Sequence, residues 1–271
     1  GGASESGTQS VTITITDNEN APTVTLSVSA TSIAENAGSS LTLTATLSGA
    51  ADEAVTVSLS TSSTAIESTD YTDGSGNIDD ITISAGDTTG TVNFTPTDDS
   101  VYEGNETAII AISGVSGADA TENGTQTVTI TITENESAPT ITLTRSAASI
   151  DENSGSTITL TATISGVTDS AVTVALSTSG TATEGTDYGT ISDITISAGA
   201  TTGTATLDPT DDNIYEDDET ATIDISSVSG KSGVTENSTQ QVSVTIAENE
   251  SAPTVTLATS ATSIAENAGS S

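Results

Sequence analysis

Two acidic stretches of nearly the same sequence stand out, because carboxylates at this density can bind a metal cation. The first is TPTDDSVYEGNE at residues 95–106, and the second is DPTDDNIYEDDE at residues 208–219. Each carries four or more carboxylates within twelve positions. Neighbouring carboxylates repel by about 1 kcal/mol or more per close pair at a surface-like dielectric. They raise one another's pKa or push the loops apart, so the pattern predicts that a cation joins them.

The chain offers almost no positive charge of its own to neutralise these acids. It has 271 residues with 38 Asp plus Glu, 2 Lys plus Arg and no His, for a net charge of −36. Arg145 and Lys231 cannot form the basic face that nucleic-acid binding requires, nor one that docks to an anionic membrane. Membrane insertion is not expected either, because no apolar run approaches the roughly 20 residues of a membrane helix.

The composition also excludes several kinds of catalytic chemistry. With no His and no Cys, the chain cannot form a His-based triad, a reactive thiol or the usual N/S zinc site. Paired carboxylates do serve glycoside hydrolases. However, the chain has no Trp, four Tyr and one Phe, which leaves no aromatic platform for a sugar. We therefore expect that the protein is not an enzyme.

Internal repeats define the domain organisation. SIAENAGSS at 32–40 returns as SIDENSGST at 149–157 and again at 263–271, and TQSVTITITDNENAPT at 8–23 returns at 125–140 and 239–254. Repeats at a fixed period indicate an array of similar units. We predict two complete units at 21–137 and 138–251. Residues 1–20 would be the C-terminal strand of a preceding repeat, and 252–271 the N-terminal part of a following one.

The elements that must position the acids are short β-strands. The first unit contains seven runs with period two: TVTLSVS, LTLTATLS, AVTVSLS, DITIS, GTVNFTP, TAIIAIS and TVTITIT. Alternation of Val, Ile or Leu with Thr or Ser buries one face of a strand and exposes the other, and clusters of Gly, Asn, Asp and Ser separate the runs. This pattern predicts an all-β fold of tandem seven-stranded antiparallel, immunoglobulin-like β-sandwiches.

Several ordered motifs in both complete units resemble the Calx-beta domain, the calcium-binding sandwich of sodium–calcium exchangers and of many large bacterial surface proteins. They are the early Glu, the T-D-Y after the third strand, the A-G turn before the fifth, and D-D-x-x-Y-E-x-x-E after it. The resemblance implies Ca²⁺ as the cofactor. Its closing cluster departs from the family, because Glu-Asn-Glu stands where an Asp-rich run is expected.

The resemblance also implies which residues hold the calcium. In the first unit they are Glu35, Asp70, Asp98, Asp99, Glu103 and Glu106, with Glu134 and Glu136 in the closing cluster. In the second unit they are Glu152, Asp187, Asp211, Asp212, Glu216 and Glu219, with Glu248 and Glu250 closing. Calcium takes six to eight oxygen ligands, more than one loop supplies here. Alternate strand ends of an antiparallel sandwich lie at the same end, so three remote segments can converge.

Interpretations of the same residues without a metal stay open. The acidic loops also fit solvated turns, Asp70 and Asp187 are residue types common in turns, and Glu35 and Glu152 fit solvent-facing positions. The stretch DGSGNID at 73–79 alternates like an EF-hand loop but lacks Gly at the sixth position and Glu at the twelfth, so we interpret it as a hairpin extension. The four Tyr residues are expected to pack at the ends of the sandwiches.

The expected function is structural and adhesive. ENESAPT at 134–140 and 248–254 ends one unit and begins the next, and Pro139 and Pro253 restrict that junction. Calcium held there would stiffen an array of neighbouring repeats in a long extracellular or cell-surface protein. The segments 8–16 and 252–271 could also join chains into a filament by strand addition.

Two other functions remain as alternatives. One is a module whose Thr-rich faces, such as Thr129, Thr131 and Thr133, bind a regular surface such as ice or a glycan. A regular Thr lattice across neighbouring strands would favour it. The other is a calcium-sensing regulatory domain, which predicts calcium affinity near cytosolic levels.

Overall fold

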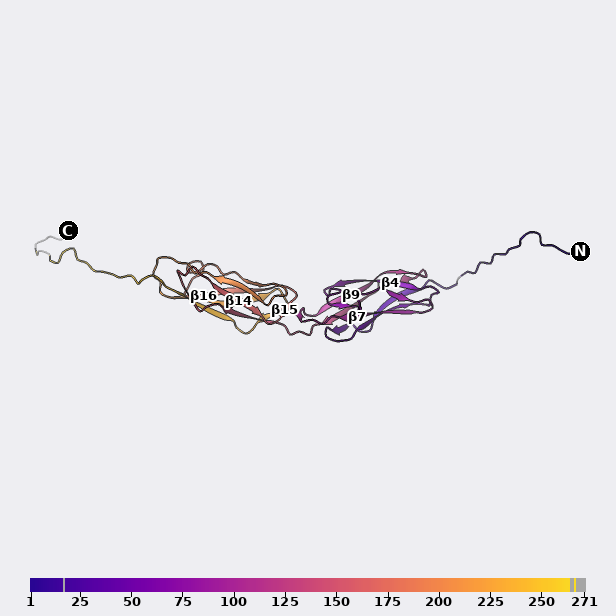
Figure 1. Ribbon diagram of the computed structural model, residues 1–271, viewed down its shortest axis with the longest axis horizontal. Coiled ribbons are helices and arrows are strands. Elements are labelled where there is room, and N and C mark those ends of the chain that lie inside the picture. Colours follow the sequence, from indigo (N-terminus) through magenta and orange to yellow (C-terminus); the bar gives the residue numbers. More distant parts are fainter. Residues whose placement is uncertain (17, 264–265, 267–271) are drawn as a thin grey trace. The chain divides into compact units, whose positions relative to one another are not determined.

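The computed structural model describes residues 1–16, 18–263 and 266 and divides them into two compact units. The first unit comprises Gly1–Asp99 and Asn105–Asn135, and the second comprises Ser100–Gly104 and Glu136–Ser271. Both are built from β-strands and loops (Figure 1). Within the described residues, no helix is long and apolar enough to cross a membrane.

The first unit is a sandwich of two five-stranded sheets, which have the orders β10-β1-β3-β7-β5 and β2-β11-β9-β4-β6. Its strands are β1 (Thr23–Val28), β2 (Ser32–Ala34), β3 (Leu41–Leu47), β4 (Val55–Ser63), β5 (Tyr71–Thr72), β6 (Ile81–Ile83), β7 (Thr89–Pro96), β9 (Glu106–Ser116), β10 (Thr121–Glu122) and β11 (Thr127–Thr133).

The second unit repeats this plan with sheets of order β18-β14-β12-β20 and β13-β21-β19-β16-β17, and a two-stranded pair of β15 and β8. Its strands are β8 (Val101–Tyr102), β12 (Thr140–Arg145), β13 (Ser149–Asp151), β14 (Ile158–Ile164), β15 (Val167–Thr168), β16 (Val172–Gly180), β17 (Ile194–Ile196), β18 (Thr202–Leu207), β19 (Glu219–Ser229), β20 (Thr235–Glu236) and β21 (Gln241–Ala247).

The predicted tandem β-sandwiches are confirmed, and short strands add to the seven expected runs. In the first unit, all seven runs form strands: β1, β3, β4, β6, β7, β9 and β11. The additional β10 and β2 pair in parallel with β1 and β11, in a register that sets Ile33 beside Ile132. Neither β2 nor β10 lies in one of the seven alternating runs, and alternation does not show which strands pair, so the sequence could not predict these parallel pairs.

The core follows the alternation of the sequence. Along β3 the residues alternate strictly between buried and half-buried, with Leu43 and Ala45 fully buried. Two predicted packing residues lie deep inside: Tyr71 stacks on Phe94 with ring centroids 4.5 Å apart, and Tyr188 is 1% exposed. Tyr215 differs, because 37% of it is exposed.

The segments at the two ends of the described chain contribute no strand. Residues 8–16 nearly repeat the sequence of β11, yet Val11, Ile13 and Ile15 are 82–92% exposed. Near the other end, Val255 and Leu257 are almost fully exposed. The assignment of 1–20 and 252–271 to further repeats remains a prediction, and residues 264–265 and 267–271 of the second segment lie outside the described residues.

Candidate metal centre

The first cluster of carboxylates in the second unit consists of Glu152, Glu248 and Glu250. One oxygen of each lies within 4.8 Å of the others. Glu152 directly follows β13, and its backbone N–H donates to the carbonyl of Ala247, 3.0 Å away at the end of β21. The parallel pairing of these two strands therefore brings Glu152 beside the Glu-Asn-Glu that follows β21, although the two segments are almost 100 residues apart in sequence.

Hydrogen bonds hold this first cluster in place. Oε1 of Glu248 accepts the backbone N–H groups of Asn249 and Glu250, each at 2.8 Å. Oε1 of Glu152, a residue only 9% exposed, accepts the N–H of Asp212 at 3.1 Å. Oε2 of Glu250 is buried and has no hydrogen-bond partner within the described part of the chain. A buried carboxylate oxygen without a donor carries an unmet desolvation cost, which a cation would remove.

The second cluster consists of Asp187, Glu216 and Glu219, whose ligand oxygens also lie within 4.8 Å of one another. A tight turn sets Asp187, because its Oδ2 accepts the N–H of Thr183 at 2.6 Å and its own N–H donates to the carbonyl of Thr183 at 3.0 Å. Glu219 is the first residue of β19. Asp187 thus acts as a turn residue, as its type suggested, and also faces the two glutamates.

The two clusters are adjacent. The backbone N–H of Glu216, in the second cluster, donates to Oε2 of Glu248, in the first, at 2.5 Å. A small cavity is lined by members of both, namely Glu152, Asp187, Glu216, Glu219 and Glu248, together with Asp217 and Ile246. We call these six clustered residues the acidic end of the second unit: Glu152, Asp187, Glu216, Glu219, Glu248 and Glu250.

Burial, hydrogen bonds and neighbouring carboxylates shift the pKa values at the acidic end. Burial, and then a hydrogen bond with Asp187, raise the pKa of Glu219 to about 7. Burial also raises the pKa of Glu152 and Glu216, and neighbouring carboxylates add to the rise. By contrast, the N–H groups of Glu216 and Glu250 hold the pKa of Glu248 down at about 2. Glu248 is therefore a fixed negative charge, while Glu219 holds a proton up to near neutral pH.

The donor set and spacing suit calcium. Two oxygens bound to one Ca²⁺ at about 2.4 Å are at most about 5 Å apart, so the spacing within each cluster is compatible with one shared ion. In the described part of the second unit, the ion pair is that of Lys231 with Asp169 at 2.7 Å, and none of the six acids takes part in it. Glu152, Glu248 and Glu250 would hold one ion, and Asp187, Glu216 and Glu219 another.

In the first unit, two pairs of acids correspond to members of the two clusters of the second unit. Oxygens of Glu35 and Glu134 lie within 4.8 Å, as do those of Asp70 and Glu106. Glu35 and Asp70 are 6% and 7% exposed, so Glu35, like Glu152, is not the solvent-facing side chain of the interpretation without a metal. Of the remaining predicted ligands here, Glu103 and Glu136 fall in segments that are counted with the second unit.

The paired aspartates are placed differently from the glutamates. The carboxylates of Asp98, Asp99, Asp211 and Asp212 are in none of the three-residue groups. Asp212 instead bonds to its own loop, since its Oδ1 accepts the N–H of Ile214 at 2.6 Å. The N–H groups of Asp99 and Asp212 donate to Glu35 and Glu152 at 3.3 and 3.1 Å. Their role as calcium ligands stays a prediction, while their backbones orient the buried glutamates.

The residue just before the last Glu of each acidic loop was missed by sequence reasoning. Oδ1 of Asn105 accepts the N–H of Glu134 at 3.0 Å, and Oδ1 of Asp218 accepts the N–H of Glu248 at 3.1 Å. Both side chains anchor the start of the closing cluster. The recurrence of a short carboxylate or amide at this position of both loops was the available signal.

The EF-hand-like stretch is a self-contained turn. Oδ1 of Asp73 accepts hydrogen bonds from the N–H groups of Ser75 and Gly76 and from the hydroxyl of Ser75. These bonds hold the pKa of Asp73 below its usual value. The stretch is in none of the candidate metal groups among the described residues, in keeping with a hairpin extension.

Comparison with known proteins identifies the family. The Calx-beta domain matches residues 17–136 and again 134–250. Among solved structures, the chain is similar to CBD12 from CALX1.2 (18% identity, 83% of this chain and 100% of that one, TM-score 0.36) and to calcium binding domain CBD12 of CALX1.1 (14%, 79% and 95%, TM-score 0.34).

The chain is also similar to the Yersinia pseudotuberculosis adhesin InvE (14% identity, 82% of this chain and 58% of that one, TM-score 0.37). No curated protein matches. The two family matches together cover most of the chain and coincide with its two sandwiches. The chain therefore belongs to the Calx-beta domain family and carries two such domains in tandem.

Proposed function

We propose that each unit binds Ca²⁺ at its acidic end and that the bound ions stiffen a tandem array of these domains. One observation carries the proposal. Glu152 is 9% exposed and lies in a cluster with Glu248 and Glu250. Oε2 of Glu250 is buried and accepts no hydrogen bond within the described residues. Carboxylates are almost never buried unless they are paired or coordinate a metal, and the chain has two basic residues in all.

The proposed role of the ion is to join segments that otherwise repel. The bound Ca²⁺ would attract carboxylates that otherwise repel one another. They come from a loop (Glu216), the start of β19 (Glu219) and the segment after β21 (Glu248 and Glu250). Because Glu248 stands five residues before Pro253, fixing it also fixes the start of the segment that leads out of the unit. Glu134 and Pro139 have the same spacing after the first unit.

The proposed setting is outside the cell, in a long surface or secreted protein. Extracellular modules bind calcium with weak affinity, about 10⁻⁴–10⁻³ M, which suits clusters that lie at an accessible end of a sandwich. A structural or adhesive role, rather than catalysis, agrees with the lack of His and Cys. An affinity near 10⁻⁷–10⁻⁵ M would instead favour the calcium-sensing alternative.

The test is thermal unfolding of the whole chain in calcium and in chelator. Calcium at about 100 times Kd should stabilise the domain that binds it by about 2.7 kcal/mol, a rise of several degrees in Tm. Combined changes Asp187→Asn, Glu219→Gln and Glu248→Gln should remove the rise of the second domain. The control is Asp208→Asn, an exposed acid outside the clusters. Equal midpoints with and without calcium in the unchanged chain would refute calcium binding.

A second candidate function, binding to a regular uncharged surface, is favoured by the outer face of one sheet in each unit. Strand register aligns hydroxyl residues in rows across three strands. The rows are Thr25–Thr46–Thr89 and Ser27–Thr44–Thr91 in the first unit, and Thr142–Thr163–Thr202 and Thr144–Thr161–Thr204 in the second. These rows contain no charged residue, although the chain carries 38 acids. On the other sheet of the first unit, Thr131 lies in a row with Ser32 and Thr107, whereas Thr129 lies opposite Ile109 and forms no such row.

This candidate is tested by inhibition of ice recrystallisation and by binding to insoluble polysaccharide. Thr44→Glu with Thr161→Glu places a charge at the centre of a row in each unit and should abolish binding. Thr129→Glu, an exposed position on the other sheet that lies opposite Ile109 and outside any such row, is the matched control. Lack of binding by the unchanged chain would leave β-propensity as the reason for these threonines.

A further inference from the structure

Each unit contains a further glutamate, missed by sequence reasoning, close to a proposed calcium ligand. Glu67 stands three residues before Asp70, and Glu184 stands three residues before Asp187. Both glutamates are half-buried, and neither is in a candidate metal group of the described residues. A half-buried carboxylate in a chain with two basic residues must find hydrogen-bond donors elsewhere.

Two hydrogen bonds occupy the carboxylate of Glu184. Its Oε2 accepts the hydroxyl of Thr178, in β16, at 2.7 Å. Its Oε1 accepts the backbone N–H of Ile191, a buried residue shortly before β17, at 3.0 Å. The side chain therefore ties β16 to the segment that leads into β17, and each of its oxygens already has a donor.

The first unit repeats both bonds across a longer loop. Oε2 of Glu67 accepts the hydroxyl of Thr61 at 3.0 Å, and Oε1 accepts the N–H of Ile78 at 2.5 Å. The glutamate and the isoleucine are 11 residues apart here, against 7 in the second unit. Because the contact is kept although the loop length differs, the carboxylate, and not the length of the loop, fixes these two points.

The glutamate lies inside the turn that presents the aspartate. In the second unit, Thr183 donates its N–H to Oδ2 of Asp187 at 2.6 Å and accepts the N–H of that residue at 3.0 Å. On the other side of Glu184, Gly185 donates its N–H to the carbonyl of Tyr188 at 2.8 Å. Both sequence neighbours of Glu184 are thus bonded to the segment with Asp187, so anchoring Glu184 anchors the residues that hold the aspartate.

The turn of the first unit is built in the same way. The N–H of Ile66 donates to Oδ2 of Asp70 at 2.5 Å, and the N–H of Asp70 donates to the carbonyl of Ile66 at 2.8 Å. Asp70 is 7% exposed, so any shift of this turn would move a buried carboxylate. The arrangement therefore belongs to the domain and not to one copy of it.

We propose that Glu67 and Glu184 are positioning residues for calcium: each holds the turn that presents Asp70 or Asp187 to the ion and is not itself a ligand. This inference rests on the proposed function, because it concerns the same calcium sites. Removing a hydrogen-bonded layer behind metal ligands lowers metal affinity about 10–100-fold. A loss of that order is expected when the side chain of either glutamate is removed.

A glutamate so close to the site could instead act as a direct ligand or as a charge that attracts the ion. Both of these roles need the negative charge, whereas a positioning role needs the hydrogen bonds. Gln keeps the length of the side chain. Its carbonyl oxygen can accept the N–H of Ile191, and its amide can donate to the hydroxyl oxygen of Thr178. Glu184→Gln therefore separates positioning from the two roles that depend on charge.

Calorimetric titration with calcium tests the second unit alone when Glu35→Gln and Asp70→Asn remove proposed ligands of the first. In that background, Glu184→Ala should raise the Kd for calcium at least about tenfold, while Glu184→Gln should raise it much less. The control is Asp193→Ala, which removes a structural bond of the same domain to the N–H of Leu176 and should leave Kd unchanged. An unchanged Kd for Glu184→Ala, or equal losses for Ala and Gln, would overturn the proposal.

Amide hydrogen exchange in chelator reads the turn without calcium. The N–H of Asp187 bonds to Thr183 and not to Glu184, so its exchange rate reports whether the turn itself is held. Glu184→Ala should make this N–H exchange several-fold faster, and Glu184→Gln and Asp193→Ala should not. A faster exchange of the Ile191 N–H alone would show that the turn is held without the glutamate, and would overturn the proposal.

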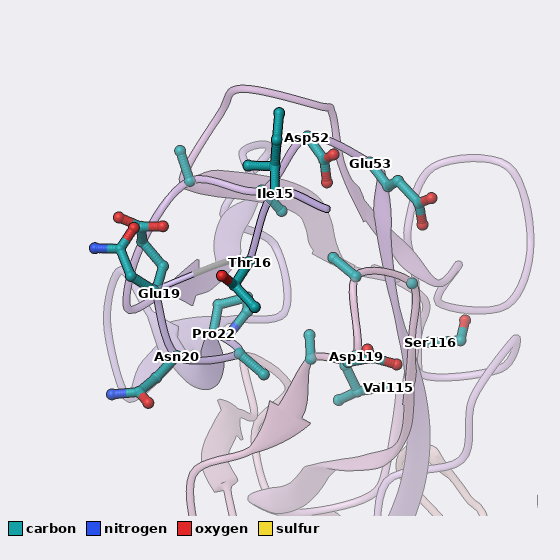
Figure 2. A pocket seen from close by; sticks show the side chains of 17 residues that line it. Ile15, Thr16, Glu19, Asn20, Pro22, Asp52, Glu53, Val115, Ser116 and Asp119 are labelled. Carbon is teal, nitrogen blue, oxygen red and sulfur yellow. The ribbon is translucent and has the colours of Figure 1, made fainter. Parts of the chain in front are cut away.

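The first unit supplies an independent repeat of the titration. In the triple variant of the thermal test, which lacks proposed ligands in the second domain, Glu67→Ala should weaken calcium binding as Glu184→Ala does. The control is Glu53→Ala. Figure 2 shows Glu53, an exposed acid on the loop between β3 and β4, at the wall of an open cavity. An unchanged Kd for Glu67→Ala would overturn the proposal, because both units have the same two hydrogen bonds.

Failure of this inference and failure of the proposed function give different results. If the background chain binds calcium and Glu184→Ala leaves Kd unchanged, the positioning role falls and the proposed function stands. If the chain binds no calcium in any variant, the proposed function falls. Faster exchange of the Asp187 N–H in Glu184→Ala would then still show that the glutamate holds the turn, although the turn presents no ligand.

Discussion

The backbone N–H of Glu216 donates to Oε2 of Glu248 across 2.5 Å and so joins the two acidic clusters of the second unit. Each residue belongs to a different cluster, so this hydrogen bond connects the two clusters. In the proposed site, an ion bound by Glu248 would therefore also affect the position of Glu216, a proposed ligand of the second ion.

This link predicts that the two clusters bind calcium cooperatively. Glu248→Gln removes a ligand from one cluster and weakens the acceptor that orients the other, so we expect calcium binding to weaken about tenfold or more at both, as for ligands held by a hydrogen-bonded second layer. Isothermal titration with Glu248→Gln and with the control Asp208→Asn measures this. Loss at one site alone would show that the clusters are independent.

Without calcium, the second domain should become less stable as pH rises from acid to neutral. The pKa of Glu219 is raised to about 7 from an ordinary 4.5, chiefly by burial. The folded chain thus binds this proton more tightly than the unfolded chain. The resulting stabilisation is fully present below about pH 4.5 and is lost as pH rises through about 7.

The check is the Tm of the second domain in chelator at about pH 5 and about pH 7.5, on either side of the Glu219 titration. We expect a lower Tm at the higher pH, and Glu219→Gln should flatten the difference. In calcium the trend should reverse, because the metal competes with the proton for the carboxylate. A pH response in chelator that Glu219→Gln leaves intact would point to a different group.

The stacked pair Tyr71 and Phe94 should dominate the stability of the first domain's core. Both are fully buried, with ring centroids 4.5 Å apart, and Leu207 takes the place of Phe94 in the second domain. Phe94→Ala should lower the free energy of unfolding by about 3–5 kcal/mol, while Phe94→Leu, which copies the second domain, should cost much less. Urea unfolding measures the free energy of unfolding of both variants. Equal losses would show that the cavity left by the ring does not cause the destabilisation.

Gly203 should tolerate no side chain. A Cβ there would lie 2.4 Å from the carbonyl oxygen of Thr195 and 2.7 Å from Cγ2 of Ile194. We expect Gly203→Ala to destabilise the second domain by about 1–3 kcal/mol, the usual cost of overpacking. Gly189→Ala is the matched control in the same domain, since its nearest atom would be 4.0 Å away. Similar midpoints for the two variants in thermal unfolding would contradict the close approach.

Much of the fold was determined by the sequence alone. The period-two runs from Thr23 to Thr133 became strands with the expected buried faces, because alternation along a strand depends only on neighbouring residues. The repeats and the motifs around Asp70 and Asp98–Glu106 identified the Calx-beta family. The types of the acids, with two basic residues in the chain, already indicated a need for a cation.

Tertiary structure alone decided which acids meet. Glu152 reaches Glu248 and Glu250 because β13 pairs in parallel with β21, a pairing that no pattern within the sequence of β13 reveals. The same structure places Asp187 in a cluster with Glu216 and Glu219, and turns Asp212 back onto its own loop. Contacts across roughly 100 residues depend on strand order and register, which local periodicity does not encode. For this reason, the sequence could not tell which acids of the acidic loops join a cluster and which bond only to their own loop.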